Sequence, residues 1–410
     1  MQINQIKKYT SSKLALLCAT VFLAVSCNKD LPEAIPIEFP DANPIAKTLG
    51  EEISSNPDYS IFKAAATKVG AMALLNDNTK RFTLFVPNNA AFIASGITAD
   101  AIAALPAATV GAIVQYHIIP GKQFLAADIP STFPNVQLPS YMKIGELPGT
   151  IVPIQMSIFP SKRGNTIWAN TMPLTATDLK FKNGVIHLVA AVVAPPSAVL
   201  KDVIAAKPDL SYFRAAVVRA DSGANLATTE SLNFLLAYPV TNMTILAPND
   251  NAFKTLIHGS IFGYLVGQGV DPATANDQAT ALSSTPDVFK NPALYGVLTA
   301  ATVKGILAYH FLATNAGAGF QPNIRVFSNN FATTPTAYKT LVNAVVSVHP
   351  GVMAQATFTG PFVSSLTFTG MGTFPPNGPP FSDAPATAVS RDNHGVNGVF
   401  HIIDKVLLPQ

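Results

Sequence analysis

Two tyrosine–histidine pairs are the residues of this sequence whose types and spacing are best suited to chemistry. Tyr116 is followed by His117, and Tyr309 by His310. A phenol and an imidazole can donate and accept hydrogen bonds, and an imidazole can take up a proton near neutral pH. Each pair ends an amphipathic run, GAIVQ or KGILA. Because adjacent residues of a helix point in different directions, we expect at most one member of each pair to face the core. The other could be structural or could contact a ligand.

Two further polar positions lie near the ends of apolar segments. His187 and His401 follow Val and Ile or Phe in predicted strands. We expect each ring to be half-buried and bonded to a backbone carbonyl. Asp178 and Asp392 precede these strands, and we expect their carboxylates to cap a turn.

Sequence patterns of known catalytic sites are missing from the chain. It has no G-x-S-x-G, no H-E-x-x-H and no G-x-x-x-x-G-K-[ST] pattern. We therefore predict a protein that is not an enzyme, with no catalytic, metal-binding or cofactor-binding residues. A glycosidase carboxylate pair stays open, because two such acids meet only in the folded chain.

The composition describes a globular, weakly charged protein. Of 410 residues, 49% are hydrophobic and 12% charged, which excludes an intrinsically disordered chain. The basic excess comes from Lys7, Lys8 and Lys13, and without them basic and acidic groups balance. A neutral body has no field that attracts phosphates, so we predict no nucleic-acid partner.

The first residues are typical of an export signal. The lysines precede an apolar stretch, 14–25, which is too short to span a bilayer. It ends in LAVSC, which resembles a bacterial lipoprotein signal, with Cys27 as the acylated residue. We predict a signal peptide over 1–26 and a proline-rich tether over 27–44. An ordinary secretory signal cleaved nearby is the alternative.

That resemblance also implies a location. The lipid on Cys27 would be the only membrane attachment. Residues 28–30, NKD, resemble surface-export tags of some Bacteroidota lipoproteins. We therefore expect a lipid-anchored protein of the cell envelope, at the outer membrane or the cell surface, with the leaflet left open.

An internal duplication sets the expected domain organisation. Four sequence blocks recur in the same order, which chance similarity would not preserve. The pairs are SIFKAA and SYFRAA, TLFVPNNAAF and TILAPNDNAF, the two Tyr-His pairs, and NGVIH and NGVFH. We predict one domain over 45–195 and a second over 196–410, with insertions enlarging the second.

The expected elements of each copy are mixed. Apolar periodicity predicts helices over 59–75, 90–94, 98–105 and 110–117, and strands over 82–86, 185–193 and 399–408. Asn183-Gly184 and Asn397-Gly398 are expected to form hairpin turns with positive φ angles. The fold class is therefore predicted to be α+β.

Taken together, the four blocks resemble the fasciclin domain over most of 45–409. The resemblance implies a compact α+β domain, a small β-sandwich or wedge with a layer of helices. It also implies extracellular adhesion or matrix binding, usually without catalysis. In some animal members the Tyr-His pair is implicated in adhesion, so Tyr116, His117, Tyr309 and His310 are the candidate ligand residues.

Three functions follow as hypotheses. The first is a cell-surface lipoprotein that mediates adhesion by binding an extracellular protein or polysaccharide. The second is a carbohydrate-binding accessory protein of glycan uptake, with aromatic residues of the insertions as a sugar-stacking surface. Those residues are Tyr264, Tyr295, Phe374 and Phe381. The third is an uncharacterised hydrolase. The ligand and the oligomeric state are left open.

Overall fold

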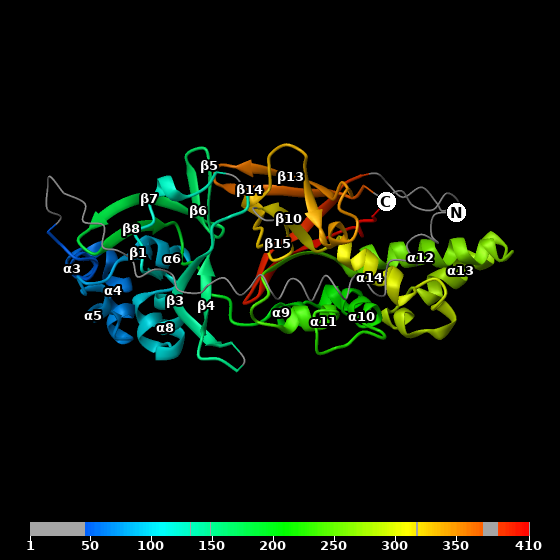
Figure 1. Ribbon diagram of the computed structural model, residues 1–410, viewed down its shortest axis with the longest axis horizontal. Helices are drawn as coiled ribbons and strands as arrows, with labels where there is room; N and C mark the ends of the chain where they lie inside the picture. The colour runs from blue at the N-terminus through cyan, green and yellow to red at the C-terminus, as the bar shows by residue number, and fades with distance from the viewer. Residues whose placement is uncertain (1–45, 132, 148, 317–318, 372–383, 410) are drawn as a thin grey trace. The chain divides into compact units, whose positions relative to one another are not determined.

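Figure 1 presents a computed structural model that describes residues 46–409 except 132, 148, 317–318 and 372–383. The described residues form two compact units, one ending at Pro196 and the other beginning at Ser197. We call them the N-terminal unit and the C-terminal unit, and each is described by itself. The predicted signal peptide (1–26), the tether (27–44) with Cys27, and Phe374 and Phe381 lie outside the described residues.

The N-terminal unit begins with helices whose starts are fixed by side-chain caps. Thr48 and Glu51 form a reciprocal capping box at the first helix, and Asn88 and Thr98 cap two later ones. The helices are α3 (Leu49–Ser55), α4 (Ser60–Lys68), α5 (Ala71–Leu75), α6 (Asn89–Ala94), α7 (Ala99–Ala104) and α8 (Ala107–Tyr116), with 3-10 turns η2 (Pro57–Tyr59) and η3 (Ala126–Asp128).

A six-stranded sheet and a separate hairpin complete this unit. The sheet has the order β2-β1-β8-β7-β6-β5, and β3 pairs with β4. The strands are β1 (Phe82–Pro87), β2 (Ile118–Pro120), β3 (Leu138–Glu146), β4 (Pro153–Ile158), β5 (Pro160–Arg163), β6 (Thr166–Ala169), β7 (Met172–Phe181) and β8 (Gly184–Val189).

The C-terminal unit also starts with helices, most of them short. They are α9 (Leu200–Ala205), η4 (Pro208–Leu210), α10 (Ser211–Ala220), α11 (Leu232–Ala237), α12 (Asp250–Gly267), α13 (Pro272–Leu282), η5 (Pro286–Lys290), η6 (Pro292–Leu294) and α14 (Ala300–Tyr309), followed by η7 (Ser328–Asn330) and η8 (Leu341–Ala344). Figure 1 shows α12 and α13 side by side.

Its sheet has eight strands in the order β11-β10-β12-β13-β14-β15-β16-β9. The strands are β9 (Met243–Pro248), β10 (Leu312–Ala316), β11 (Gly319–Gln321), β12 (Thr336–Thr340), β13 (Val352–Thr359), β14 (Phe362–Thr369), β15 (Ala386–Gly395) and β16 (Gly398–Ile403). The insertion between β9 and α14 therefore forms regular elements, chiefly the extended α12 and α13.

Both units are built around the same parallel strand pair. In the N-terminal unit β1 lies parallel to β8, with Phe82 opposite Gly184. In the C-terminal unit β9 lies parallel to β16, with Met243 opposite Gly398. These are the positions that the repeated sequence blocks align.

The two cores are equivalent residue by residue. The N-terminal core is formed by α4, β1, α6, α8 and β8, which contribute Phe62, Leu84, Phe92, Val114 and Ile186. The C-terminal core uses Phe213, Ile245, Phe253, Leu307 and Phe400 at the matching positions. Two copies of one α+β architecture are present, and the predicted fold class is confirmed.

Three local predictions differ from the structure. The predicted helix 59–75 is interrupted, because Gly70 adopts a left-handed conformation (φ 71°) between α4 and α5. The predicted strands 185–193 and 399–408 stop earlier, at Val189 and Ile403.

Hairpins form before β8 and β16, but the predicted Asn-Gly turns are wrong, because the turn residues are 182–183 and 396–397 and the glycines already begin the strands. None of their Asn-Gly residues has a positive φ. The glycines are required because a Cβ on Gly184 would lie 2.3 Å from the Phe82 carbonyl oxygen. On Gly398 it would lie 2.4 Å from the Met243 oxygen.

Candidate functional site

The two Tyr-His pairs lie at the ends of equivalent helices, α8 and α14. Tyr116 and Tyr309 are the last helical residues, and His117 and His310 are the C-caps. All four side chains are fully buried. The expectation that one member of each pair faces outward is wrong, because the helix ends at the histidine and the ring is bonded to a segment distant in sequence.

Each histidine joins a helix end to the last segment of its unit. His117 Nδ1 lies 2.8 Å from the Ile113 carbonyl oxygen, and the Val193 N–H donates to Nε2 at 3.1 Å. His310 repeats this with the Ile306 carbonyl at 2.8 Å and the Leu407 N–H at 3.0 Å. Since Nε2 accepts, Nδ1 carries the proton and satisfies a carbonyl of the last helical turn. These bonds hold the segments that follow strands β8 and β16.

Burial keeps both imidazoles neutral. Loss of hydration lowers the pKa of His117 and of His310 to about 4, although the bond from Nδ1 to a carbonyl opposes the shift. Both rings have a partner at each nitrogen. They act as neutral structural connectors rather than as acid–base groups.

Each tyrosine fastens its helix to a strand. The Tyr116 hydroxyl donates to the Ser157 carbonyl of β4 at 2.9 Å and accepts from the Asn170 amide at 3.0 Å. The Tyr309 hydroxyl donates to the Gly351 carbonyl, just before β13, at 2.6 Å and accepts from the Met371 N–H at 3.0 Å. Both tyrosines are thus buried rings with satisfied hydroxyls.

It follows that none of the four candidate ligand residues presents a side-chain atom to solvent. The resemblance to fasciclin domains suggested that these side chains contact a ligand directly. Their burial argues against a direct contact. Tyr116, His117, Tyr309 and His310 can influence binding only through the strands and segments that they hold.

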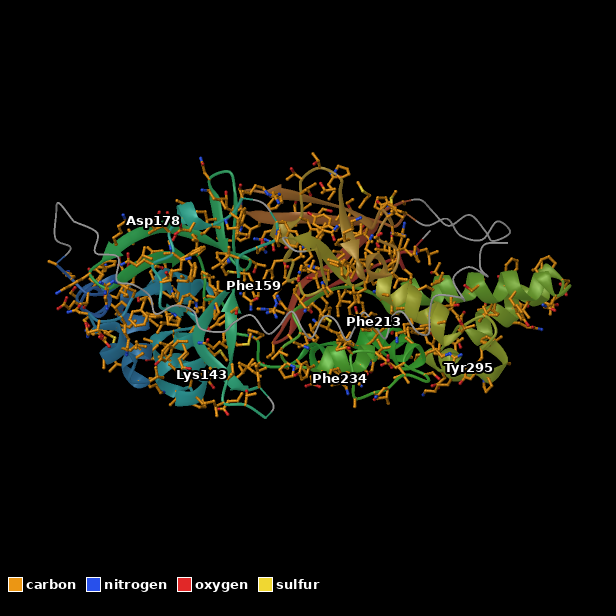
Figure 2. The ribbon with its side chains drawn as sticks, viewed as in Figure 1. Lys143, Phe159, Asp178, Phe213, Phe234 and Tyr295 are labelled. Carbon is orange, nitrogen blue, oxygen red and sulfur yellow. The ribbon has the colours of Figure 1, made fainter. Side chains whose placement is uncertain are left out.

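A second set of matched polar residues holds the closing hairpin. His187 is buried, with Nε2 at 2.8 Å from the Phe124 carbonyl oxygen. The Asp178 N–H donates to His187 Nδ1 at 3.3 Å, and the Asp178 carboxylate accepts from the Ala126 N–H at 2.9 Å. Asp178, labelled in Figure 2, sits in an irregularity of β7 with φ 61°. The Asp178 carboxylate therefore caps a turn, as expected, but this turn is η3 and not the hairpin turn that follows Asp178.

The C-terminal unit repeats this set. His401 Nε2 lies 3.0 Å from the Val326 carbonyl oxygen, and Nδ1 accepts from the Asp392 N–H at 3.3 Å. The Asp392 carboxylate accepts from the Ser328 N–H at the start of η7 at 2.7 Å. Both histidines are bonded to a backbone carbonyl, as predicted, and both are fully rather than half buried. Burial lowers the pKa of each ring.

The asparagine of each Asn-Gly pair has a role that sequence reasoning missed. The Asn183 amide accepts from the Leu49 N–H at 2.9 Å and donates to the Leu75 carbonyl at 2.9 Å. Asn397 accepts from the Leu200 N–H at 2.7 Å and donates to the Leu236 carbonyl at 3.0 Å. The NGV sequence recurs in both copies and could have indicated this role. A hairpin turn, however, was enough to account for the asparagine without any contact of its side chain.

The described residues hold no group of three or more His, Cys, Asp or Glu side chains able to bind a metal ion. Among the helices of these residues, none combines the length and the apolar character that crossing a membrane requires.

One exposed feature of the N-terminal unit has the character of a contact surface. The β3–β4 hairpin ends in a tip where Ile151 is 89% and Val152 50% exposed. The tip is ordered by hydrogen bonds, with Leu147 N–H to the Val152 carbonyl at 2.9 Å and Val152 N–H to the Thr150 hydroxyl at 3.1 Å. We call Ile151 and Val152 the hairpin tip.

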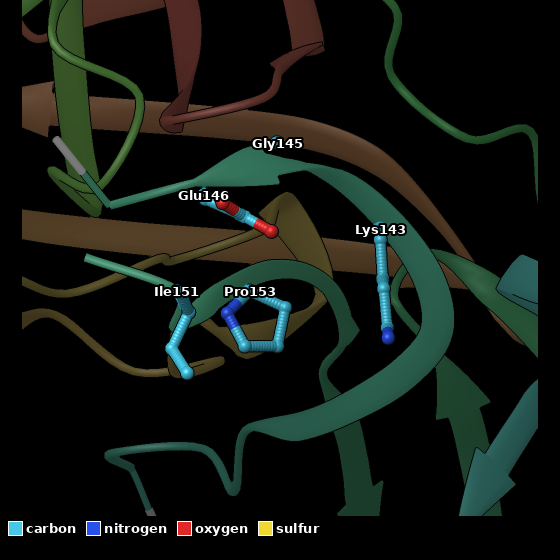
Figure 3. A pocket seen from close by; sticks show the side chains of 5 residues that line it. All are labelled: Lys143, Gly145, Glu146, Ile151 and Pro153. Carbon is cyan, nitrogen blue, oxygen red and sulfur yellow. The ribbon is translucent and has the colours of Figure 1, made fainter. Parts of the chain in front are cut away.

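An open hollow of about 480 Å³ adjoins the hairpin tip. Figure 3 shows the residues that line it, which are Lys143, Gly145, Glu146, Ile151 and Pro153. It offers one positive charge, one negative charge and apolar surface. The base of the same hairpin is held by the Tyr116 hydroxyl through Ser157.

The aromatic residues expected on the insertions are partly exposed where they are described. Tyr264 lies on α12, and Tyr295 follows η6 and is covered by the Arg219 guanidinium, 3.7 Å from the ring centroid. Figure 2 labels Tyr295 in the C-terminal unit. A face already occupied by a guanidinium is not free to stack on a sugar.

Comparison with known proteins finds a family model that matches part of the chain. Residues 57–195 match the sequence model described as "Fasciclin domain". The match covers most of the N-terminal unit, so this unit is similar to fasciclin domains.

One solved structure similar to the chain is a FAS1 domain pair from the insect cell adhesion molecule fasciclin I. The identity is 13%, the match covers 86% of this chain and 97% of that chain, and the TM-score is 0.31. No match was found among curated protein sequences.

Proposed function

We propose that this protein is a lipid-anchored protein of the cell envelope that binds an extracellular protein or polysaccharide and mediates adhesion. The observation that carries the proposal is the fasciclin domain match over 57–195. The lipoprotein-like signal that ends at Cys27 supports the extracellular location. We further propose that the C-terminal unit is a second fasciclin domain, because its strand register and core repeat those of the first. No catalytic activity is proposed.

The hairpin tip is the binding surface that we propose for the N-terminal unit. An exposed, hydrogen-bonded apolar tip loses little conformational freedom on binding and gains from the burial of its side chains. Scattered exposed apolar residues need no explanation, but Ile151 and Val152 are adjacent and border a hollow with Lys143 and Glu146. In this arrangement Tyr116 is a positioning residue, because it fixes the strand that carries the tip.

Adhesion assays test both parts. Cells that lack the gene should adhere less to an extracellular-matrix or polysaccharide coating, and the wild-type gene should restore adhesion. A double variant, Ile151→Ser with Val152→Ser, should restore adhesion about tenfold less well, because an apolar contact is lost. Its melting temperature should match the wild type, since both side chains are exposed.

A matched control is Val218→Ser on α10, where the valine is 66% exposed in the C-terminal unit. It should adhere like the wild type. Full adhesion without the gene would refute the proposed function. Full adhesion of the double variant would refute the hairpin tip alone.

A further inference from the structure

The C-terminal unit has a polar groove beside a helix that is longer than its N-terminal counterpart. Equivalent helices begin after Asn88 and Asn249, but α6 ends at Ala94 whereas α12 continues to Gly267. A short connection then leads into α13, which packs along α12. The groove between them has a volume of about 470 Å³, within the range of small-ligand sites.

The groove is lined by polar side chains, none of them acidic. They are Lys254, Thr255 and His258 of α12, and Thr280, Ser283 and Ser284 at the end of α13. Lys254 is the fifth residue after the N-cap of α12. The fifth residue after the N-cap of α6 is Ile93. Lys254 and Thr255 therefore lie in the part of α12 that corresponds to α6, whereas His258 and the α13 residues lie beyond it, in the insertion.

The charge of Lys254 is available to a ligand. Its ammonium group forms no hydrogen bond or ion pair with the residues that the structure describes, and lies 5.5 Å from the centroid of the Tyr212 ring. Asp250, one turn earlier, is directed to α10, where it accepts from the Ser211 hydroxyl at 2.7 Å and the Tyr212 N–H at 2.9 Å. Asp287, after α13, is paired with Lys290 at 2.8 Å.

The hydroxyl groups of the groove face a ligand as acceptors. Thr255, Thr280 and Ser284 already donate their hydrogens to helix carbonyls, at 3.0, 2.8 and 2.7 Å. Their remaining lone pairs can accept hydrogen bonds from a ligand's hydroxyl groups. The groove thus combines a cationic donor with several neutral acceptors.

The floor of the groove is fixed before any ligand binds. The buried Tyr212 hydroxyl donates to the Ser283 carbonyl at 2.8 Å and ties α10 to the end of α13. His258 is held parallel to Phe262 on the next turn, with ring centroids 6.4 Å apart. A preformed site loses less affinity to the ordering of its side chains.

We propose that this groove binds an acidic saccharide, with the carboxylate or sulfate group at Lys254 and sugar hydroxyls at the threonine and serine oxygens. The inference deepens the proposed extracellular binding and rests on it, since it names the class of ligand. A neutral saccharide would leave the ammonium group without its anion, whereas a simple anion would leave the hydroxyl acceptors unused.

Calorimetric titration of the purified protein tests this. The probes are trisaccharides of galacturonic acid, of sulfated galactose and of unmodified galactose. We expect at least one acidic probe to bind about tenfold more tightly than the neutral one, as a charge-assisted hydrogen bond requires. Which acidic probe binds identifies the anionic group.

Variants locate the binding. Lys254→Gln should weaken acidic-probe binding about tenfold. Ser284→Asp, which adds a negative charge at an exposed position, should abolish it. Lys201→Gln, at an exposed lysine of α9, is the matched control and should bind like the wild type. All three should retain the wild-type melting temperature.

Equal binding of neutral and acidic probes, binding of neither acidic probe, or wild-type affinity in Lys254→Gln would overturn the inference. These outcomes are distinct from a failure of the proposed function. That failure is measured as full adhesion of cells lacking the gene and does not depend on saccharide titration.

Discussion

The buried histidines make the stability of this protein depend on pH. His117 and His310 have a pKa of about 4 when folded, against an ordinary value of 6.5. In the unfolded chain these two imidazoles take up protons below pH 6.5. In the folded chain they do so only near pH 4. Stability present above pH 6.5 should therefore be lost as the pH falls through this window, by about 3 kcal/mol for each of the two residues.

Urea unfolding between pH 7.5 and 4 measures this loss. Burial also lowers the pKa of His187, His394 and His401, which adds to the effect in the same direction. A free energy of unfolding that stays constant across the window would contradict the buried, neutral state of these rings.

Removing one tyrosine hydroxyl tests the connection between α14 and its strand. In Tyr309→Phe the Gly351 carbonyl and the Met371 N–H lose a partner, while the ring still fills its place. We expect the free energy of unfolding to fall by about 1–3 kcal/mol. Tyr264→Phe, at a partly exposed ring, is the control and should unfold like the wild type. An unchanged value in Tyr309→Phe would mean that water replaces the hydroxyl.

At the level of residues, the sequence indicated which positions matter but not where they point. The Tyr-His pairs recur, and a helix rule suggested one inward and one outward side chain. The rule fails at a helix end, where His117 caps the last turn and is bonded to Val193 of a distant segment. Such burial depends on contacts distant in sequence, which periodicity does not contain.

The closing hairpins depend on two glycines because strands approach closely there. Gly184→Ala should lower the free energy of unfolding by about 3 kcal/mol, since the new methyl group meets the Phe82 backbone as well as the Leu49 side chain. Gly398→Ala should act alike against Met243. Gly263→Ala within α12 has open space and should stabilise by about 0.5–1 kcal/mol.

Denaturant unfolding followed by circular dichroism compares the three variants. If the free energy of unfolding of Gly184→Ala is not lower than that of Gly263→Ala, the strands can separate to admit the methyl group without cost. At this scale the helices from α4 to α8 and strands β1, β8 and β16 were predicted, because their apolar patterns are strong, whereas β2 to β7 were not. The break at Gly70 was not, since a glycine inside an apolar run is also compatible with a continuous helix.

For the whole molecule, the proposed lipid anchor makes a prediction that does not depend on the fold. Cells supplied with a palmitate analogue should incorporate it into the wild-type protein, while Cys27→Ala should remain unlabelled and be released from membranes. Label in the variant, or membrane retention without Cys27, would contradict lipidation at this residue.

The duplicated organisation was visible in the sequence because the repeated blocks are the residues that the architecture cannot vary. Asn183 and Asn397, Gly184 and Gly398 all occupy backbone contacts that are identical in the two units. The groove between α12 and α13 was not predictable, since His258 and its α13 residues lie in an insertion that has no counterpart to compare.

The parallel pairing of β1 with β8 also bears on the order of events during synthesis. The strand that completes the first unit leaves the ribosome about a hundred residues after its neighbour, and Asn183 then ties down Leu49 from near the start. Contacts so distant in sequence form slowly. A nascent chain of this kind stays open until nearly all of a unit has been made, which suits the export that we propose.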